Sequence, residues 1–427
     1  MENREEKIKV IHRITKSSSA CLHGDNKSNG NEVFSNHDHI PIDLTREIIM
    51  RLPAKSIVRF RCVSKLWWSI TTQPNFINSF AIRQSSIPRQ NLLITFVEQD
   101  NGKKQVFCML PIHKNSTSYS DVNNFHIIFP PTKVFCGYYT ISVNGLITFR
   151  TNTEIIIWNP TMREHITFIK PKSSKHARCF LGYDSTENTY KLLLMACSYR
   201  KCEKYQKPEI LTLGSQESWR VIENSPAQDP KCMYYCINGI LYYNAVISFE
   251  EDRDDHSILP SLQIMSFDVR SELFKSIQLP GRANQYQDGL MLEESLISYQ
   301  RKLAWVCYNS KIIKIWVLKD AEKQVWLENE FVLPLPQRDL PEIAWLHGAT
   351  STGEFIYVSG NAPKDISTFY YDPVRETIRS VKGIEYEQFR RCYGSNDNFV
   401  SSLSLHAFPD HIENLMSLKH IMCSPSV

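Results

Sequence analysis

The sequence predicts a multidomain chain of the α plus all-β class: a small N-terminal helical domain, then a β-propeller-like domain of about six blades. Three observations lead to this prediction. Apolar residues recur at helical spacing between residues 40 and 84, short strands with turn residues follow after residue 91, and one type of hairpin recurs through this second region. A length of 427 residues suggests roughly two or three domains unless one of them is a large β domain.

The overall charge gives no indication of a nucleic-acid or membrane partner. Lysine and arginine number 49 against 45 aspartate and glutamate residues, a net charge of +4, whereas a nucleic-acid-binding domain usually carries a strong basic surplus. The charge is uneven, because residues 40–84 carry +5 and the remainder carries −1. The longest apolar runs, such as Leu192 to Cys197, are far shorter than the roughly 20 residues that cross a bilayer.

The N-terminus and the cysteines favour an intracellular protein. The chain begins MENREEKIKVIHRITKSSSA, with charges throughout and no apolar stretch before a cleavage site, so no secretory signal is expected. We therefore expect the protein in the nucleus, the cytoplasm or both. The 12 cysteines include no Cys-x-x-Cys pair, so reduced thiols are expected rather than disulfides or zinc ligands.

Residues 1–37 are expected to form a disordered N-terminal tail. They contain few large apolar side chains and cannot bury enough surface to offset the entropy of ordering. His37 and His39 directly precede the first expected helix, and an ordinary solvated pair is favoured over a metal site.

The next region is expected to form three or four short helices. Leu44, Ile48 and Leu52 recur with a spacing of four residues, which is the period of one helix face. Pro53 and Pro74 mark where helices end and begin, because proline lacks a backbone donor and fits only the first turn.

This helical domain, residues 38–84, is too small to be secure alone. Domains near about 40 residues usually need a metal, disulfides or a partner, and its single cysteine, Cys62, supplies neither of the first two. Its apolar residues therefore either pack against the larger domain or belong to an interface with another protein. The residues by themselves leave both alternatives open.

The helical domain resembles the F-box of plant F-box proteins, almost position for position from Ile40 to Trp67. The motif residues occur together in IPIDLTREIIMRLPAKSIVRFRCVSKLW, and this combination is hard to produce by chance. The resemblance implies a docking module for a Skp-type adaptor and, through it, a cullin. The implied adaptor-binding residues are Ile40, Pro41, Leu44, Ile48, Leu52, Pro53, Ile57, Phe60, Val63 and Trp67. Some of them must fill the domain's own core, and the sequence does not separate the two groups.

Basic residues dominate the same region. They are Arg46, Arg51, Lys55, Arg59, Arg61, Lys65 and Arg83, against Asp43 and Glu47. This surplus fits an acidic adaptor surface and would mainly raise the association rate. An ordinary solvated helix face is the alternative.

After an expected linker at residues 85–91, residues 92–408 show strands with an internal repeat. One hairpin type recurs, usually with Asn or Asp at its first turn position. The equivalent positions are Asn159, Gly214, Asp268, Asp320 and Asp372, at steps of 55, 54, 52 and 52 residues. Asn and Asp side chains bond the backbone two residues further on, which explains their recurrence at a turn.

A second hairpin precedes most copies of the first. It contains Asn144-Gly145 and Asn238-Gly239, and Asn-Gly between apolar runs indicates a type I′ turn. Two hairpins per repeat make one four-stranded blade, and the period of 52–55 residues lies in the range of kelch repeats. Five blades are visible, and the strands within 92–110 and 399–408 could combine into a closing sixth. A β-sandwich with accidental spacing is the alternative.

Motifs in this domain resemble the plant F-box-associated interaction domain. They are Trp158-Asn159-Pro160, Arg163-Glu164, Gly182-Tyr183-Asp184 and Tyr190-Lys191, and the resemblance covers about residues 92–408. We interpret these residues as structural signatures. Residues 409–427 are expected to form a C-terminal tail.

The sequence contains no recognisable catalytic, cofactor or metal motif. Gly-rich phosphate loops, a Gly-x-Ser-x-Gly elbow and a His-Glu-x-x-His zinc motif are all missing. The acidic run 250–255 is expected to be a solvated loop, and a site for a cation or a basic target is the alternative. The segments 199–208 and 333–341 are long and interrupt the succession of strands, and loops on one rim of a propeller commonly carry recognition. The sequence does not tell which of them share a rim, and the target-binding residues are unknown.

The resemblance implies a substrate-recognition subunit of a Skp/cullin/F-box (SCF) ubiquitin ligase. In this interpretation the F-box holds the adaptor, the propeller holds a target protein, and the chain is not an enzyme. It needs no cofactor, no nucleic acid and no membrane. Two alternatives stay open: a propeller enzyme, such as a glycosidase or an oxidase, with an appended helical domain, and an adaptor-bound F-box protein without a role in ubiquitin transfer.

Overall fold

The computed structural model describes most of the chain from residue 40 onward. The described residues are 40–87, 91–98, 104–111, 124–126, 141–151, 153–171, 177–197, 206–215, 218–247, 261–280, 286–287, 290–291, 293–308, 312–333, 344–359, 365–385, 404–409 and 411–422. The expected N-terminal tail, with His37 and His39, lies outside them, and so does the acidic run 250–255. None of the described helices has the length and apolar character needed to span a membrane.

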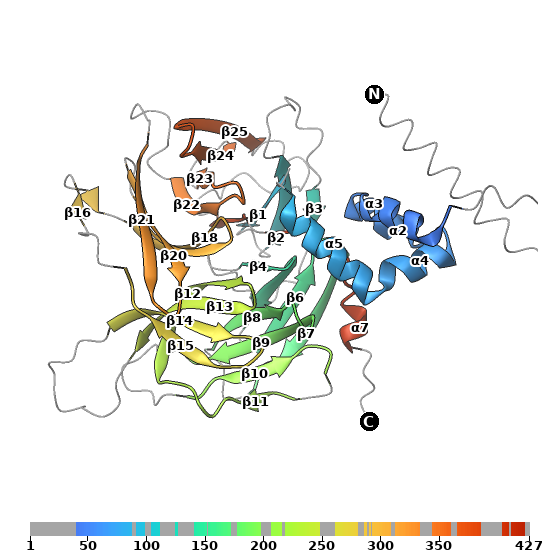
Figure 1. Ribbon diagram of the computed structural model, residues 1–427, viewed down its shortest axis with the longest axis horizontal. Coiled ribbons are helices and arrows are strands. Elements are labelled where there is room, and N and C mark those ends of the chain that lie inside the picture. Colours follow the sequence, from blue (N-terminus) through green and yellow to red (C-terminus); the bar gives the residue numbers. More distant parts are fainter. Residues whose placement is uncertain are drawn as a thin grey trace, which may run out of the picture.

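Four helices form the N-terminal unit, which we call the helical module (residues 40–87). They are α2 (Ile42–Met50), α3 (Ala54–Phe60), α4 (Lys65–Thr72) and α5 (Pro74–Ser86) (Figure 1). Pro41 and Pro53 directly precede α2 and α3, and Pro74 is the first residue of α5, where proline costs no helical hydrogen bond. Ser64 caps α4, because its Oγ accepts a hydrogen bond from Leu66 N at 3.1 Å. These local signals explain why the helices begin where they do.

The helical module has a core to which the distant C-terminus contributes. The residues of its four helices that form this core are Ile49, Ala54, Ile57, Trp67, Ile70, Phe76 and Phe80. Leu415 belongs to the same cluster and is 0% exposed. The module is therefore a folded unit that takes one core side chain from the other end of the protein.

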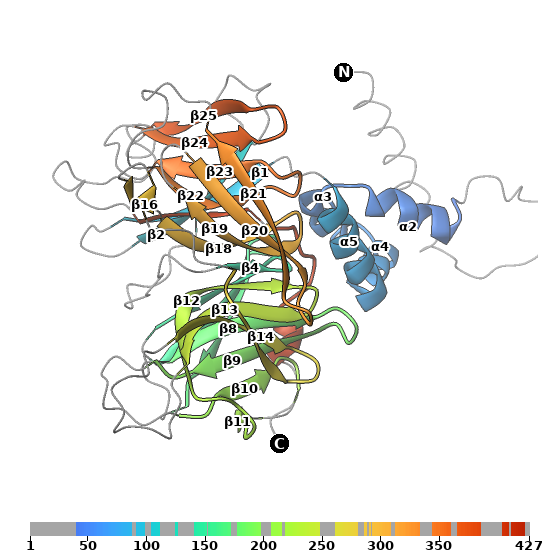
Figure 2. The same cartoon turned by 60° about the vertical axis from the view of Figure 1, so that its left-hand side comes forward.

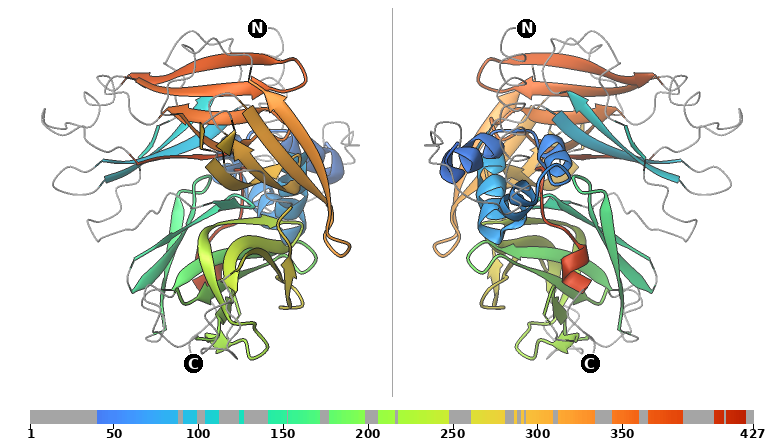
Figure 3. Two further views of the ribbon diagram at one scale, coloured as in Figure 1. Left: turned by 90° about the vertical axis from the view of Figure 1, so that its left-hand side faces the viewer. Right: turned by 90° about the vertical axis from the view of Figure 1, so that its right-hand side faces the viewer.

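The rest of the described chain is a propeller of six four-stranded antiparallel sheets, its blades (Figures 1 and 3). Blade 1 contains β1 (Asn91–Glu98), β2 (Lys104–Pro111), β3 (Asn124–His126) and β26 (Ser404–Phe408), and blade 2 contains β4 (Ser142–Val143), β5 (Leu146–Arg150), β6 (Glu154–Asn159) and β7 (Glu164–Ile169). Blade 3 contains β8 (Arg178–Asp184), β9 (Thr189–Met195), β10 (Glu209–Thr212) and β11 (Arg220–Val221), and blade 4 contains β12 (Gln228–Ile237), β13 (Ile240–Ile247), β14 (Ser261–Asp268) and β15 (Phe274–Ile277). Blade 5 contains β18 (Glu293–Tyr299), β19 (Lys302–Tyr308), β20 (Ile312–Asp320) and β21 (Val325–Val332), and blade 6 contains β22 (Ala344–Ala349), β23 (Phe355–Ser359), β24 (Asp365–Asp372) and β25 (Thr377–Glu385). A short pair, β16 (Tyr286–Gln287) and β17 (Leu290–Met291), lies between blades 4 and 5 in the chain.

Blade 1 is assembled from both ends of the propeller. Strand β26 pairs with β1, so that Leu93 lies opposite Phe408 and Thr95 lies opposite His406. This pairing joins the first strands of the propeller to its last one and closes the ring. The predicted propeller is confirmed, and its closing blade forms from the two terminal segments as expected.

The recurring hairpin is built by local side-chain chemistry. Oδ1 of Asn159, Asp268, Asp320 and Asp372 accepts two backbone N–H bonds each, from the second and third residues after it, at 2.8–3.2 Å. Gly214, the fifth member of the series, has a φ of +79° instead. The side-chain bonds explain why Asn or Asp recurs at this turn.

The hairpin formed by the first two strands of a blade has type I′ character in three blades. The φ pairs are +45° and +84° at Asn144-Gly145, +50° and +80° at Asn238-Gly239, and +48° and +61° at Gln300-Arg301. Two consecutive positive φ values are the mark of this turn. Blades 2, 4 and 5 therefore share one backbone solution for their first turn.

The two faces of the propeller carry different connections. Because each blade is an antiparallel meander, its first and third turns lie at one face, and its middle connection and the link to the next blade lie at the other. The helical module lies beside the face of the first and third turns (Figure 2). The strand ends that flank segments 199–208, 250–255 and 333–341 lie at the opposite face: they belong to β9 and β10, to β13 and β14, and to β21 and β22. Most of the residues of these three segments lie outside the described ranges.

The end of the chain departs from the tail expected for residues 409–427. Residues 411–422 run along the propeller beside the helical module and end in a short helix, α7 (Lys419–Met422) (Figure 3). Ile412, Leu415 and Leu418 are 7%, 0% and 0% exposed. The sequence did not reveal this burial because the surfaces that cover these side chains come from residues far away in the chain. We call residues 411–418 the C-terminal strap.

Candidate functional site

Some of the residues predicted to bind an adaptor belong to the core of the helical module. Ile57 and Trp67 are 0% and 1% exposed. Phe60 is half-buried, and its ring meets Trp67 edge-on with centroids 4.8 Å apart. Ile48 and Leu52 are also half-buried and border the same core. These side chains hold the module together, and Ile40 borders the core in the same way.

A second group of the predicted residues faces solvent. Pro41, Leu44, Pro53 and Val63 are exposed, with exposed fractions of 56% at Leu44 and 52% at Val63. Large aliphatic side chains are normally among the most buried residues of a domain. Their exposure here makes this group the candidate binding surface.

Three exposed apolar residues of α2 and α4 were missed by the sequence analysis. Ile42, Leu66 and Trp68 are 61%, 43% and 53% exposed. A signal for one of them is present, because neighbouring residues on a helix point in different directions, so Trp67 and Trp68 cannot both face one core. We call the combined set the apolar surface. It consists of Pro41, Ile42, Leu44, Pro53, Val63, Leu66 and Trp68.

Helix α2 carries more apolar residues than its buried face requires. Thr45 and Ile49 are its buried positions, at 4% and 0% exposure. Ile42 and Leu44 lie outside that buried stripe. A helix that served only the module and the propeller would need one apolar face, whereas α2 carries apolar residues on more than one.

The outer helices of the module are not covered by the propeller. Figures 1 and 2 place α2 at the end of the molecule that lies away from the blades. The exposed fractions of Leu44 and Trp68 contradict the alternative in which all apolar residues of the module pack against the larger domain.

The basic residues of the module divide in a similar way. Arg83 donates from Nη1 to the carbonyl of Met50 at 3.0 Å, and Arg61 points inward, where burial lowers its pKa. The exposed cations are Arg51, Lys55, Arg59 and Lys65, and Arg46 is half-buried. Arg51 pairs with Glu47 at 2.8 Å, and both side chains are more than half exposed, so this pair adds little to stability. The apolar surface thus lies on a module with a positive exterior.

The surroundings of the cysteine thiols in the described residues determine whether they could act as nucleophiles. Burial raises the pKa of Cys179 and Cys307 to about 12 and that of Cys236 to about 11. These thiols stay protonated at neutral pH and are poor nucleophiles. Within the described ranges, no group of three or more His, Cys, Asp or Glu side chains is arranged to hold a metal ion.

Comparison with known proteins agrees with this geometry. Residues 38–78 match the family model described as F-box domain, and residues 91–412 match the one described as F-box associated beta propeller domain. The F-box protein At5g18160 of Arabidopsis thaliana is 34% identical over 429 residues, which cover 98% of this chain and 100% of that protein. Another Arabidopsis thaliana relative, At4g21240, is 38% identical over 405 residues, which cover 90% of this chain and 91% of the relative. The chain belongs to the F-box proteins that carry an F-box-associated β-propeller domain.

Proposed function

We propose that this protein is the substrate-recognition subunit of an SCF-type ubiquitin ligase. Its F-box binds a Skp-type adaptor and, through it, a cullin, while its propeller binds a target protein. The chain performs no chemistry of its own. It acts inside the cell, in the nucleus, the cytoplasm or both.

The apolar surface of the helical module is the observation that carries this proposal. Leu44 and Trp68 are 56% and 53% exposed although the core of the module is already filled by other side chains. Burying one large apolar side chain is worth about 1.5–3 kcal/mol, so several together favour a protein partner. Membership of the F-box family supports a Skp-type adaptor as this partner, because F-box domains generally bind such adaptors.

The surface cations support an acidic partner surface. Lys55, Arg59 and Lys65 are exposed on the same module as the apolar surface. Charges at the rim of an interface mainly raise the association rate and set orientation, and the apolar anchors supply most of the affinity. The association rate should therefore fall with added salt more than the dissociation rate changes.

The propeller suits a receptor because its two faces can serve different tasks. The helical module lies beside the face of the first and third turns, whereas the middle connections and the links between blades start from strand ends at the other face. Connections of this kind commonly carry recognition. A target held there is tethered to the same assembly as the ubiquitin carrier, which makes transfer effectively intramolecular.

Binding of a recombinant Skp-type adaptor to the full-length chain tests this proposal. Pro41→Ala and Leu44→Ala remove parts of the apolar surface, and truncation of an interface anchor costs about 2 kcal/mol or more. We therefore expect each variant to weaken adaptor binding by roughly tenfold or more, measured by isothermal titration calorimetry.

Val374→Ala is the matched control, because Val374 is 88% exposed but lies in a turn of blade 6. It should leave the adaptor affinity unchanged, and circular dichroism should show that all three variants are folded. A wild-type chain that fails to retain the adaptor at micromolar concentrations would rule out the receptor assignment. Retention without ubiquitin transfer to any captured protein in a reconstituted reaction would overturn the ligase role and leave only the adaptor contact.

A further inference from the structure

The C-terminal strap completes the core of the F-box. Leu415 is fully buried in one cluster with Ile49, Ile57 and Trp67 of the helical module. More than 300 residues separate Leu415 from these partners in the chain. A side chain in this position links the far end of the propeller domain to the F-box core.

Polar contacts reinforce the same link. Oε2 of Glu413 accepts a hydrogen bond from Ala54 N at 3.2 Å, at the first residue of α3, whose preceding proline offers no side-chain cap. A carboxylate at a helix N-terminus is favourable because it satisfies a free N–H and meets the positive end of the helix dipole. Arg61 donates from Nη2 to the carbonyls of Thr71 at 2.8 Å and Leu415 at 3.0 Å. The strap is thus bonded to α3 and, through Arg61, to α4.

The same strap is bonded to the propeller through alternate residues. Nδ2 of Asn414 donates to the carbonyl of Asn144 at 2.7 Å and to the hydroxyl of Tyr190 at 2.9 Å. Nδ2 of Asn159 donates to the carbonyls of Asn414 at 3.1 Å and Met416 at 2.8 Å. Glu413 and Leu415 therefore serve the F-box, and the residues next to them serve blades 2 and 3.

The end of the strap is held still more firmly on the propeller. Oε2 of Glu164 accepts bonds from Ser417 Oγ at 2.9 Å and Leu418 N at 2.8 Å. The side chain of Leu418 is 0% exposed and belongs to the core shared by blades 2 to 4. One short segment thus places one leucine in each of two separate cores.

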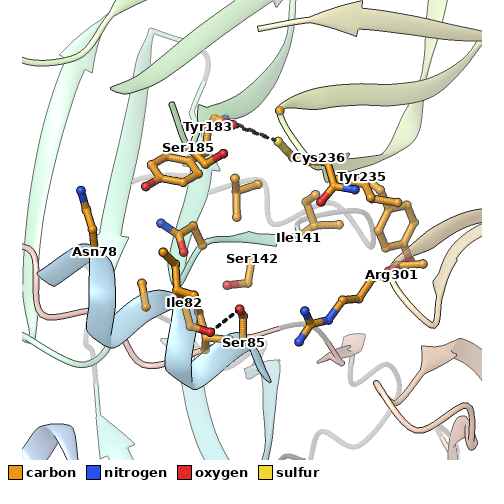
Figure 4. A pocket seen from close by; sticks show the side chains of 18 residues that line it. Asn78, Ile82, Ser85, Ile141, Ser142, Tyr183, Ser185, Tyr235, Cys236 and Arg301 are labelled. Carbon is orange, nitrogen blue, oxygen red and sulfur yellow. Dashed lines mark hydrogen bonds between the residues drawn. The ribbon is translucent and has the colours of Figure 1, made fainter. Parts of the chain in front are cut away.

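Direct packing between α5 and the propeller is much looser. A cavity of about 270 Å³ lies between them, lined by Ala81, Ile82 and Ser85 of α5 and by turn residues such as Asn238 and Arg301 (Figure 4). A gap of this size removes the van der Waals contacts that would fix an orientation. The α5 side of the interface is therefore only partly packed against the propeller.

Direct hydrogen bonding across the interface is also sparse. In the described part of the chain, the bond that links the helical module to a blade without the strap is a weak one, from Arg61 Nη1 to Met162 Sδ at 3.7 Å. Among the described helices, the largest contact with a strand is that of α7 with β7, and α7 directly follows the strap. The geometric link between the two units thus runs mainly through residues 411–418.

We propose that the C-terminal strap is a positioning element that fixes the orientation of the F-box on the propeller, with Asn414 and Leu415 as its positioning residues. Its consequence for ubiquitin transfer rests on the proposed ligase role. In a reaction driven by proximity, a fixed orientation keeps the target at one distance and angle from the ubiquitin carrier. A loosened strap would let the target sample many positions, few of which are productive.

A distance measurement within the full-length chain tests the orientation directly. Labels carried by unnatural amino acids at Ser69 of α4 and Val374 of blade 6, both exposed, report the distribution of distances between the two units. The wild-type chain should give one narrow distribution. Asn414→Ala removes the donor to Asn144 and Tyr190 without touching the F-box core, and it should broaden the distribution.

Matched variants separate positioning from a general loss of structure. Leu415→Ala should also broaden the distribution, whereas the volume-conserving Leu415→Met should restore it. Val332→Ala, at a residue that is 67% exposed at the end of β21, should leave it unchanged. A distribution that stays as narrow in Asn414→Ala as in the wild type would overturn the proposal.

Adaptor binding and ubiquitin transfer distinguish this proposal from the ligase assignment. Asn414→Ala should bind a recombinant Skp-type adaptor with wild-type affinity, yet transfer to a captured target should fall on the order of tenfold, because effective concentration is lost. If the adaptor fails to bind even the wild type, the ligase role is refuted while the distance result still decides the role of the strap. If transfer by Asn414→Ala stays at the wild-type rate despite a broadened distribution, the positioning role in transfer is refuted.

Discussion

At Gly145, turn geometry and close packing coincide. Its φ is +84°, as the type I′ turn requires, and a Cβ there would lie 2.6 Å from the carbonyl oxygen of Ile412 and 2.7 Å from Cβ of Asn414. Gly214 has nearly the same φ, +79°, but a Cβ there would meet nothing within 4 Å. The two glycines therefore separate the cost of backbone conformation from the cost of crowding.

We expect Gly145→Ala to destabilise the protein much more than Gly214→Ala. Both variants place alanine at a positive φ, which costs about 1–2 kcal/mol, and only the first also forces the C-terminal strap away from blade 2, which adds about 1–3 kcal/mol. Urea denaturation gives the free energy of unfolding of both variants. Equal losses would show that the strap yields freely at this contact.

At the scale of elements, turns were far more predictable than helix faces. The hairpin at Asp268 follows from one side chain and the two backbone N–H groups after it, so the sequence contains the whole cause. In α2 the spacing of Leu44 and Ile48 indicates a helix face, but the buried stripe is Thr45 and Ile49. Which stripe a helix buries depends on its neighbours, and tertiary packing determines the neighbours of α2.

The contact between β22 and β26, which we call the closing seam, contains a histidine that should respond to pH. His347 of β22 lies next to β26, and its Nδ1 accepts a hydrogen bond from Ala407 N at 3.4 Å. Its ring lies 5.5 Å from that of His406. Burial, followed by the proximity of His406, lowers the pKa of His347 to about 3. A protonated Nδ1 could no longer accept the bond from Ala407.

Acid should therefore loosen the closing seam. A histidine in an unfolded chain has a pKa of about 6.5. As the pH falls from 6.5 towards about 3, His347 is therefore protonated in the unfolded chain but not in the folded one. The contribution of His347 to stability is full above that window and is lost progressively within it. We expect melting temperatures measured from neutral pH to about pH 4 to fall less steeply for His347→Asn, whose Oδ1 can still accept the bond from Ala407. A variant with the same slope as the wild type would exclude His347 as the cause.

At the scale of the whole molecule, the propeller was predictable because the same sequence pattern recurs in several blades. Five copies of one hairpin, 52–55 residues apart, gave the blade, and the strands left over at both ends gave the closing blade. The C-terminal strap occurs once and has no local signature. Leu415 contacts residues that lie more than 300 positions away in the chain and meet it only in the folded structure. No short stretch of sequence therefore reveals its role.

Two leucines of the C-terminal strap offer a test of how the molecule divides into units. Leu415 and Leu418 are both 0% exposed and three residues apart, but they belong to the F-box core and the propeller core, respectively. Either change to alanine should cost about 2–5 kcal/mol in the unit that loses the side chain. In hydrogen exchange, Leu415→Ala should therefore raise the rates in α3 and α4, whereas Leu418→Ala should raise them in β7, β8 and β9.

Each variant is the control for the other, because the mutated residues share the strap and the same degree of burial. If both variants instead raised exchange equally in helices and blades, the strap would unite the F-box and the propeller into one cooperative unit, and the two cores would not be separable.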